Sequence, residues 1–196
     1  ENLIIKTNIK YGSLKITFYK NKFDTETIIS INQNVYKKIL YDNGFKIKIA
    51  DPIKSKYNYV LKHKTNNFLL NLLELEDAKK ENYNEVLFFN NERELMEGSK
   101  SNIFIVKDGK VYTPSEENNI LPGIKRKKVI KFLLKKDITI IEGSIKKDIL
   151  FEADEIFLTN SLHEIMPVCQ LENKLFSLEK NKLTKILMEE FNHYPE

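Results

Sequence analysis

Short apolar stretches alternate with polar turns over residues 1–50 of the chain. Residues 14–19 and 27–31 are rich in β-branched and aromatic side chains, and the polar residues between them predict two neighbouring strands. The spacing of apolar residues over 34–41 predicts a helix with Gly44 as its C-cap, and residues 45–50 alternate like a strand. This part of the sequence therefore predicts a small α/β unit.

A polar stretch after Asp51-Pro52 marks the expected boundary between two domains. Residues 54–58 are mostly polar and show no apolar periodicity, which is typical of a linker. We therefore expect a smaller domain over residues 1–55 and a larger one over residues 56–196.

The pattern after this boundary mixes strands in hairpins with helices. An amphipathic helix is expected from Thr65, and Asp108-Gly109 is a strong hairpin signal. Further strands are expected at 85–89, 102–106, 110–112, 138–141 and 155–159, and further helices at 122–134 and 178–190. Because strands and helices do not alternate strictly, we predict the α+β fold class.

Composition places the chain among ordinary folded proteins. Of its 196 residues, 41% are hydrophobic and 31% are charged, so it can bury enough apolar surface to offset chain entropy. The single cysteine, Cys169, excludes an internal disulfide and favours a reducing, cytoplasmic compartment; without a C-x-x-C pair, a metal site is not expected. No apolar run approaches the roughly 20 residues of a membrane span, so we expect a soluble protein.

The net charge of +4 is too small to indicate a polyanionic partner. Only Arg93 and Arg126 among the 32 basic residues are arginines, whereas recognition of nucleic acid normally uses the bidentate guanidinium group. We therefore expect a small-molecule substrate and no nucleic-acid partner.

Four short segments carry residue types that could work together. A lysine before a helix can form a Schiff base, and a carboxylate can pair with a protonated ring nitrogen. Two turns, one at a helix N-terminus after Pro-Gly and one with a serine, offer donors for a phosphate group. Each segment alone is common at protein surfaces, but together they describe a pyridoxal-phosphate site. The segments are residues 64–67, 97–102, 121–126 and 159–162.

The order and spacing of these motifs resemble those of a known family. K-T-N-N is followed by M-E-G-S-K-S-N-I-F, I-L-P-G-I-K-R and A-D-E-I-F-L-T-N-S-L-H-E-I-M-P-V. This series resembles the class IV pyridoxal-phosphate enzymes of fold type IV, from about Tyr11 to the C-terminus. That family includes branched-chain aminotransferases, D-amino-acid aminotransferases and aminodeoxychorismate lyases.

The resemblance implies a role for each motif. Lys64 would form the covalent bond to pyridoxal 5'-phosphate, and Glu97 would contact its ring nitrogen. Leu121 would pack against the ring. Backbone amides at Ile124 and Lys125, with Ser161, would hold the phosphate group, and Gly123 and Asn160 would belong to the same cofactor-binding site. Lys125 replaces the threonine that is usual in the family, so a cation could take the place of a hydroxyl contact.

Two histidines and the cysteine are of residue types that also occur in active sites. His63 is adjacent to Lys64, and adjacent residues in an extended segment point to opposite faces. His163 is a candidate for contact with the substrate at the rim of the pocket, although a structural role is favoured. Cys169 is expected to be a small apolar residue of the core.

The reaction depends on residues that face the substrate. The segment from Asn160 to Val168 is similar to the N-[AS]-L-x-x-[IV]-x-P-V pattern of aminodeoxychorismate lyases, and it is less like the Gly-Thr-Ala or Ser-Thr-Thr stretches of the aminotransferases. The resemblance thus implies a lyase that converts 4-amino-4-deoxychorismate to 4-aminobenzoate and pyruvate. A class IV aminotransferase that acts on branched-chain or D-amino acids remains the alternative.

Two further expectations come from the resemblance. A homodimer is expected because sites in this fold lie near a subunit interface. Family members also have an N-terminal domain that contributes a phosphate-binding arginine, and residues 1–55 correspond to its second part only. We therefore expect either a preceding segment or a shortened, cofactor-binding relative without activity.

Overall fold

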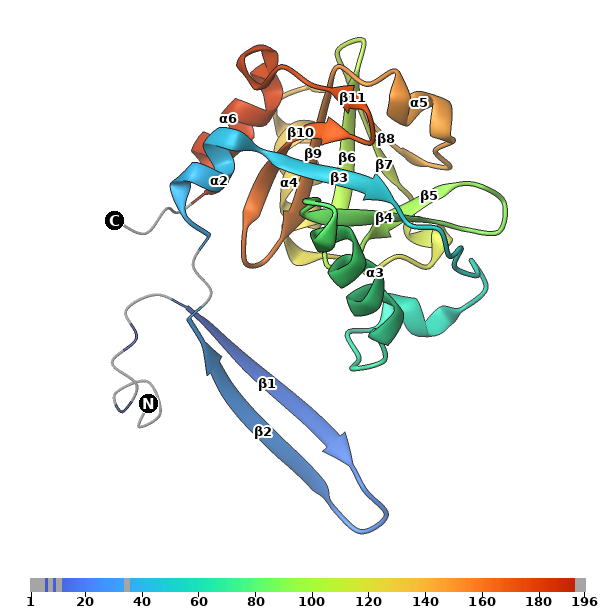
Figure 1. The fold of residues 1–196 in the computed structure, drawn as a ribbon, viewed down its shortest axis with the longest axis vertical. Helices are drawn as coiled ribbons and strands as arrows, with labels where there is room; N and C mark the ends of the chain where they lie inside the picture. Colours follow the sequence, from blue (N-terminus) through green and yellow to red (C-terminus); the bar gives the residue numbers. More distant parts are fainter. Residues whose placement is uncertain (1–5, 7–8, 10–11, 34–35, 193–196) are drawn as a thin grey trace. The chain divides into compact units, whose positions relative to one another are not determined.

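The structure is a computed structural model and describes residues 6, 9, 12–33 and 36–192 (Figure 1). By their contacts, these residues fall into two units, one up to Lys38 and one from Ile39 to Asn192. The predicted division at residue 55 stays a prediction.

The first unit contains a β-hairpin. Strands β1 (Ser13–Lys20) and β2 (Thr25–Asn32) pair in antiparallel register from Ser13 opposite Asn32 to Lys20 opposite Thr25. The turn between them is closed by Asn21, whose Oδ1 accepts hydrogen bonds from two backbone N–H groups. The two strands predicted from the first apolar stretches are therefore confirmed.

One mixed sheet organises the second unit. Its strands are β3 (Phe45–Ile49), β4 (Glu85–Phe89), β5 (Leu95–Gly98), β6 (Asn102–Lys107), β7 (Lys110–Pro114), β8 (Ile140–Gly143), β9 (Glu155–Asn160), β10 (Glu164–Leu171) and β11 (Lys174–Leu175). Their order is β5-β4-β3-β10-β9-β6-β7-β8, with β11 paired to β10. The pairs β3–β4, β3–β10 and β7–β8 are parallel, and the other pairs are antiparallel.

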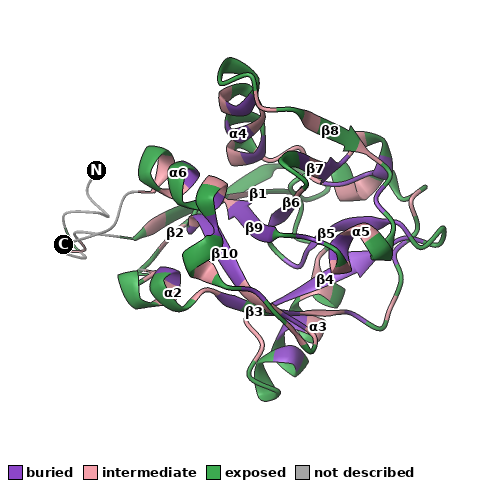
Figure 2. Ribbon diagram, turned by 90° about the horizontal axis from the view of Figure 1, so that it is seen from above, coloured by how far each residue is buried: buried purple, intermediate pink, exposed green. Residues whose placement is uncertain are grey.

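Helices pack on both sides of these strands. They are α2 (Lys38–Asn43), α3 (Leu69–Lys80), α4 (Ile124–Lys135), α5 (Lys147–Phe151) and α6 (Lys182–Phe191), with 3₁₀ turns η1 (Tyr59–Lys62), η2 (Glu116–Asn118) and η3 (Leu178–Lys180). Helix α3 lies in front of the strands and α4 behind them, and the view from above shows the same arrangement (Figures 1 and 2). No helix of the described residues is long and apolar enough to cross a membrane.

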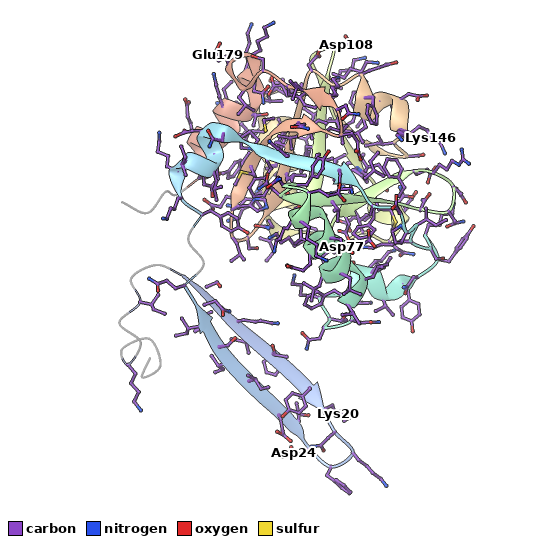
Figure 3. The ribbon with its side chains drawn as sticks, in the orientation of Figure 1. Lys20, Asp24, Asp77, Asp108, Lys146 and Glu179 are labelled. Atoms are coloured by element: carbon purple, nitrogen blue, oxygen red, sulfur yellow. The ribbon has the colours of Figure 1, made fainter. Side chains whose placement is uncertain are left out.

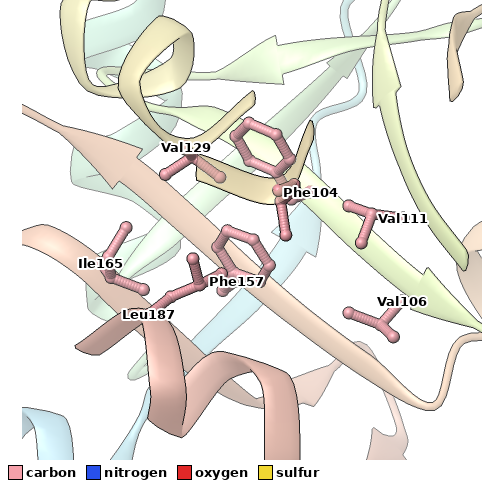
Figure 4. Packing of buried hydrophobic residues seen from close by; sticks show 8 residues of the cluster. Phe104, Val106, Val111, Val129, Phe157, Ile165 and Leu187 are labelled. Carbon is pink, nitrogen blue, oxygen red and sulfur yellow. The ribbon is translucent and has the colours of Figure 1, made fainter. Parts of the chain in front are cut away.

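The main hydrophobic core lies between the sheet and helices α4 and α6. The rings of Phe104 and Phe157, from neighbouring strands, stack at 4.9 Å with an angle of 4° between them (Figure 4). Val129 of α4 and Leu187 of α6 complete the same cluster. Charged side chains such as Asp108 lie on the outside of this unit (Figure 3). The strands predicted at 102–106 and 155–159 and the helix predicted at 122–134 therefore all contribute side chains to this core.

Several local predictions need correction. Residues 54–58 are not simply a linker, because Lys54 is buried and bridges to Asn90 beside β4. The helix expected from Thr65 begins at Leu69, and the last helix begins at Lys182 after the separate turn η3. A helix is expected over residues 34–41, and the structure has α2 from Lys38 to Asn43. Residues 34–35 lie outside the described residues.

A buried carboxylate attaches α6 to the sheet. Glu155, the first residue of β9, accepts hydrogen bonds from the backbone N–H groups of Leu183 and Thr184 and from the Thr184 hydroxyl, at 3.1, 2.9 and 2.7 Å. These N–H groups belong to the first turn of α6, where no helical carbonyl can accept them. Glu155 therefore serves as the cap of this helix from outside it.

We predict that Glu155→Ala lowers the free energy of unfolding by about 2 to 3 kcal/mol, because a charged acceptor is lost and Thr184 is left buried without its partner. Urea unfolding followed by circular dichroism measures the change. Glu189→Ala, at an exposed position of α6, is the matched control and should change stability by less than about 0.5 kcal/mol. Equal losses in the two variants would contradict the capping role.

Candidate active site

Glu97 is a buried carboxylate near the end of β5. The residue is 8% exposed, and its Oε2 accepts hydrogen bonds from the Leu121 backbone N–H at 3.0 Å and from Asn102 Nδ2 at 3.4 Å. Burial raises the pKa of Glu97 to about 7, while the positive charge of Lys54, the Leu121 N–H and the charge of Lys64 oppose that rise. The carboxyl group can therefore exchange a proton close to neutral pH.

Asn102 connects Glu97 to the segment before α4. Besides its contact with Glu97, Asn102 Nδ2 donates to the Leu121 carbonyl at 2.9 Å. Asn102 Oδ1 lies so close to Gly123 that a Cβ atom there would be only 2.1 Å from it. Position 123 therefore has no room for a side chain, and the main chain is held where α4 begins.

The first turn of α4 offers backbone donors for an anion. Its leading N–H groups have no acceptor within the helix, and the helix dipole adds a partial positive charge there. Ile124, the first helical residue, is 70% exposed. The Lys125 ammonium group donates to Glu164 Oε1 at 2.5 Å and lies 5.4 Å from the centre of the Phe191 ring. The Lys125 side chain is thus engaged with β10 and α6, while its backbone remains part of the helix start.

Arg126 fixes the start of α4 to the strands beneath it. The side chain is 1% exposed, and its Nη2 donates to the Pro114 carbonyl at 2.8 Å and to Glu142 Oε2 at 2.7 Å. These partners lie in β7 and β8. Arg126 is therefore a buried anchor for the turn at Gly123.

The turn between β9 and β10 carries two of the predicted site residues. Asn160 Oδ1 accepts hydrogen bonds from the N–H groups of Leu162 and His163, both at 2.8 Å, and Asn160 Nδ2 donates to the Lys100 carbonyl at 3.2 Å. Ser161, at the tip of the turn, is exposed. Asn160 therefore shapes the turn, and Ser161 is left accessible on it.

His163 is placed in the core rather than at an open rim. Its side chain is 0% exposed and packs edge-on against the Phe45 ring at 5.8 Å. Burial and, to a lesser extent, the charge of Lys100 lower the pKa of His163 to about 3, so its ring is neutral near pH 7. This arrangement favours the structural interpretation, and the substrate contact stays a prediction.

Lys64 lies in the segment that leads into α3 and is exposed. It is close enough to Glu97 to stabilise the charged form of that carboxyl group. Asn71, in the first turn of α3, donates from its side chain to the Ser99 carbonyl at 2.7 Å, which attaches the helix to the turn after Glu97. The fold therefore brings the predicted lysine and carboxylate to the same region.

Hydrogen bonds, close contacts and strand pairing thus link most of the predicted site residues to one another. Asn102 contacts Glu97, Leu121 and Gly123. It also lies opposite Thr159 in the β6–β9 pair, so Asn160, the next residue, is at the same end of the sheet. Sequence reasoning missed two buried charged residues beside them, Lys54 and Glu85. The roles that the resemblance gives to the individual residues stay predictions.

The raised pKa of Glu97 predicts a pH dependence of stability. A carboxyl group with a pKa of about 7 when folded and 4.5 when unfolded binds its proton more tightly in the folded chain. It therefore contributes stability that is fully present below pH 4.5 and is lost as the pH rises to about 7. Relative to Glu97→Gln, we expect the free energy of unfolding of the cofactor-free chain to fall by on the order of 3 kcal/mol across this window, measured by urea unfolding.

The comparison with Glu97→Gln is needed because His163 acts in the opposite direction. Its pKa of about 3 when folded and 6.5 when unfolded makes stability rise with pH between these values. This effect is common to both proteins and cancels in the difference between them. A difference that stays flat between pH 4.5 and 7 would show that Glu97 has an ordinary pKa.

Curated relatives found by sequence include branched-chain-amino-acid aminotransferases. Over 116 residues, or 58% of this chain, the sequence is 40% identical to a probable branched-chain-amino-acid aminotransferase of Aquifex aeolicus. Over 102 residues, or 52% of the chain, it is 42% identical to a protein of the same name from Thermotoga maritima. The matched segment is 37% of the length of each of these curated relatives.

Solved structures include similar folds with two different names. A structure from Legionella pneumophila named "Putative 4-amino-4-deoxychorismate lyase" has a TM-score of 0.84 and 26% identity, covering 95% of this chain and 71% of its own. The branched-chain amino acid aminotransferase of Escherichia coli has a TM-score of 0.82 and 23% identity, covering 96% and 66%, which shows the same fold.

The α+β fold predicted from the sequence is therefore confirmed as that of fold type IV enzymes. The model of the amino-transferase class IV family matches residues 1–171, and this family uses pyridoxal 5'-phosphate. The motifs, the fold and this match agree: the chain belongs to the class IV aminotransferase family of pyridoxal-phosphate enzymes.

Proposed function

We propose that this chain carries the cofactor site of an aminodeoxychorismate lyase, which converts 4-amino-4-deoxychorismate to 4-aminobenzoate and pyruvate. The observation that carries the proposal is the turn between β9 and β10. Its sequence from Asn160 to Val168 fits the lyase pattern at each specified position, and a structure with a lyase name is among the similar ones. The chemistry requires a cofactor site, a proton-transferring amine and a substrate-facing turn.

The residues present fit pyridoxal 5'-phosphate. The buried Glu97 carboxyl group can accept a hydrogen bond from a ring nitrogen, and its two donors leave it a further lone pair. The start of α4 offers N–H groups for the phosphate, and the close approach of Asn102 explains why Gly123 precedes them. The ring would lie between these two features, with Leu121 beside it.

The cofactor, when bound, accepts the negative charge that develops on the substrate next to its amine nitrogen. Lys64 would hold the cofactor, and its Nζ would then accept the proton that leaves the substrate ring. Loss of this proton lets a ring double bond form as the ether C–O bond breaks, which makes the ring aromatic. The three-carbon group leaves as an enolate and takes up one proton at its CH₂ carbon to become pyruvate. Glu97 favours the protonated ring nitrogen, which draws charge away from the reacting carbon.

The hydrogen bonds of this turn limit which groups it can offer to a substrate. In the Asn160 turn, the N–H groups of Leu162 and His163 both donate to Asn160 Oδ1. Two successive backbone N–H groups can otherwise bind a carboxylate. The donors that could bind a substrate carboxylate at this turn are therefore already used, whereas the exposed Ser161 hydroxyl remains available.

An aminotransferase is the second candidate because the curated relatives named above are branched-chain aminotransferases at 40–42% identity. In that case Lys64 would move a proton between the substrate and the cofactor without release of pyruvate. The same cofactor site serves both reactions, so the products decide between them. The expected homodimer stays a prediction.

We predict that the chain with bound pyridoxal 5'-phosphate forms equal amounts of 4-aminobenzoate and pyruvate from 4-amino-4-deoxychorismate. Lys64→Ala should lower this rate by about 10²- to 10⁴-fold, since it removes the general base. Product fluorescence and a coupled pyruvate assay measure the two products. Lys62→Ala, which removes an exposed lysine two positions earlier, is the matched control and should leave the rate unchanged.

The aminotransferase is tested with the same protein. If incubation with a branched-chain or D-amino acid converts the cofactor stoichiometrically to pyridoxamine phosphate, and the lyase products do not form, the lyase proposal is wrong and the alternative holds. Absence of both reactions would support a cofactor-binding relative without activity.

A further inference from the structure

The Lys54 side chain is buried beside the candidate site. The residue is 6% exposed, and its Nζ lies 3.7 Å from the centre of the Phe88 ring. Among the described residues, no hydrogen-bond acceptor is within reach of this ammonium group. Its backbone is fixed, because the Lys54 N–H donates to the Phe89 carbonyl at 2.9 Å. The fold thus holds a cation at a defined buried point.

A buried ammonium group without a hydrogen bond is costly unless other interactions compensate it. Contact with the face of an aromatic ring supplies part of the compensation. Burial lowers the pKa of Lys54, and the charges of Glu97 and Glu85 oppose that change. The two carboxylates are therefore the groups that favour the protonated amine at this position.

Strand pairing places Glu97 close to Lys54. In the β4–β5 pair, Leu87 lies opposite Gly98 and Phe89 lies opposite Leu95, with a register shift between them. The shift leaves Met96 and Glu97 together across from Phe88, the residue whose ring lies under the Lys54 ammonium group. Lys54 is close enough to Glu97 for the two charges to act on each other.

The charged groups that act on Glu97 are Lys54, Lys64 and Glu85. Glu85 is held by the hydroxyl groups of Ser99 and Ser101, and its charge makes ionisation of Glu97 harder. Lys64 is exposed and is the residue expected to bond to the cofactor. Lys54 is therefore the buried positive charge that remains available to balance Glu97.

We propose that Lys54 is a positioning residue of the cofactor site, whose ammonium group keeps the Glu97 carboxyl group ionised so that it can accept a hydrogen bond from the ring nitrogen. The proposal rests on the role given above to Glu97. Lys54 acts through Glu97 and takes no part in bond formation. Lys54 lies in the polar stretch before η1, where no sequence pattern indicates this role.

The test follows the ionisation of Glu97 in the cofactor-free chain by NMR, with glutamate labelled with ¹³C at the carboxyl carbon and the signal assigned through Glu97→Gln. In the unmodified chain the midpoint is expected near pH 7. In Lys54→Met it should rise by about one pH unit or more, as expected when a nearby opposite charge is removed. Lys56→Met removes a lysine two positions away that pairs with Glu92, and it should leave the midpoint unchanged.

An unchanged midpoint in Lys54→Met would overturn the proposal. If that variant does not fold, the reciprocal measurement replaces it, since two interacting groups shift each other equally. The titration of the Lys54 side chain, followed at ¹³Cε, should then move to lower pH by about one unit in Glu97→Gln. No movement in that variant would equally overturn the proposal.

A second measurement separates this inference from the role of Glu97. With ¹⁵N-labelled pyridoxal 5'-phosphate bound, the ring-nitrogen signal should shift toward that of the unprotonated ring in Glu97→Gln, and in the same direction by a smaller amount in Lys54→Met. If neither variant moves the signal, Glu97 does not contact the ring nitrogen and Lys54 has no positioning role. Both readouts are independent of which reaction the enzyme catalyses.

Discussion

A buried carboxyl group, that of Glu97, is the constraint on which the arrangement of the site depends. A carboxylate that is 8% exposed must receive hydrogen bonds or neighbouring positive charge, and both come from residues outside β5. The Leu121 N–H and the Asn102 amide supply the hydrogen bonds, so the segment before α4 is tied to β5 and β6. The fold cannot satisfy Glu97 without also fixing where α4 begins.

The consequences of this constraint extend across the sheet. Asn102 contacts Glu97 and lies close against Gly123. Arg126 attaches the same turn to β7 and β8 through its hydrogen bonds to Pro114 and Glu142. On the other side, the pairing of β6 with β9 sets the place where Asn160 turns the chain into β10. A ring nitrogen, a phosphate and a substrate could therefore be recognised by three features that share one hydrogen-bonded framework.

The elements with strong local signals could be predicted from the sequence, and those that depend on distant contacts could not. The apolar runs of β4 and β6 and the Asp108-Gly109 hairpin are local, and the hairpin has positive φ at both residues. Strand β10 was not predicted as a strand: it contains Pro167, which by itself argues against a strand that has neighbours on both sides.

The same distinction applies to the site. Lys64 and Glu97 were found through the order of four motifs, which a resemblance can detect. Lys54 sits in a polar stretch and has no motif, and its burial follows from a bridge to Asn90 and from the Phe88 ring, more than thirty residues further along the chain. No local pattern distinguishes such a lysine from those on the surface.

The presence of two lysines near Glu97, one exposed and one buried, allows a direct test of the whole account. Borohydride reduction of the chain with bound pyridoxal 5'-phosphate fixes the bond between the cofactor and its lysine, and peptide mapping by mass spectrometry locates it. The account predicts a single modified residue, Lys64. Modification of Lys54, or of any other lysine with Lys64 unmodified, would contradict it.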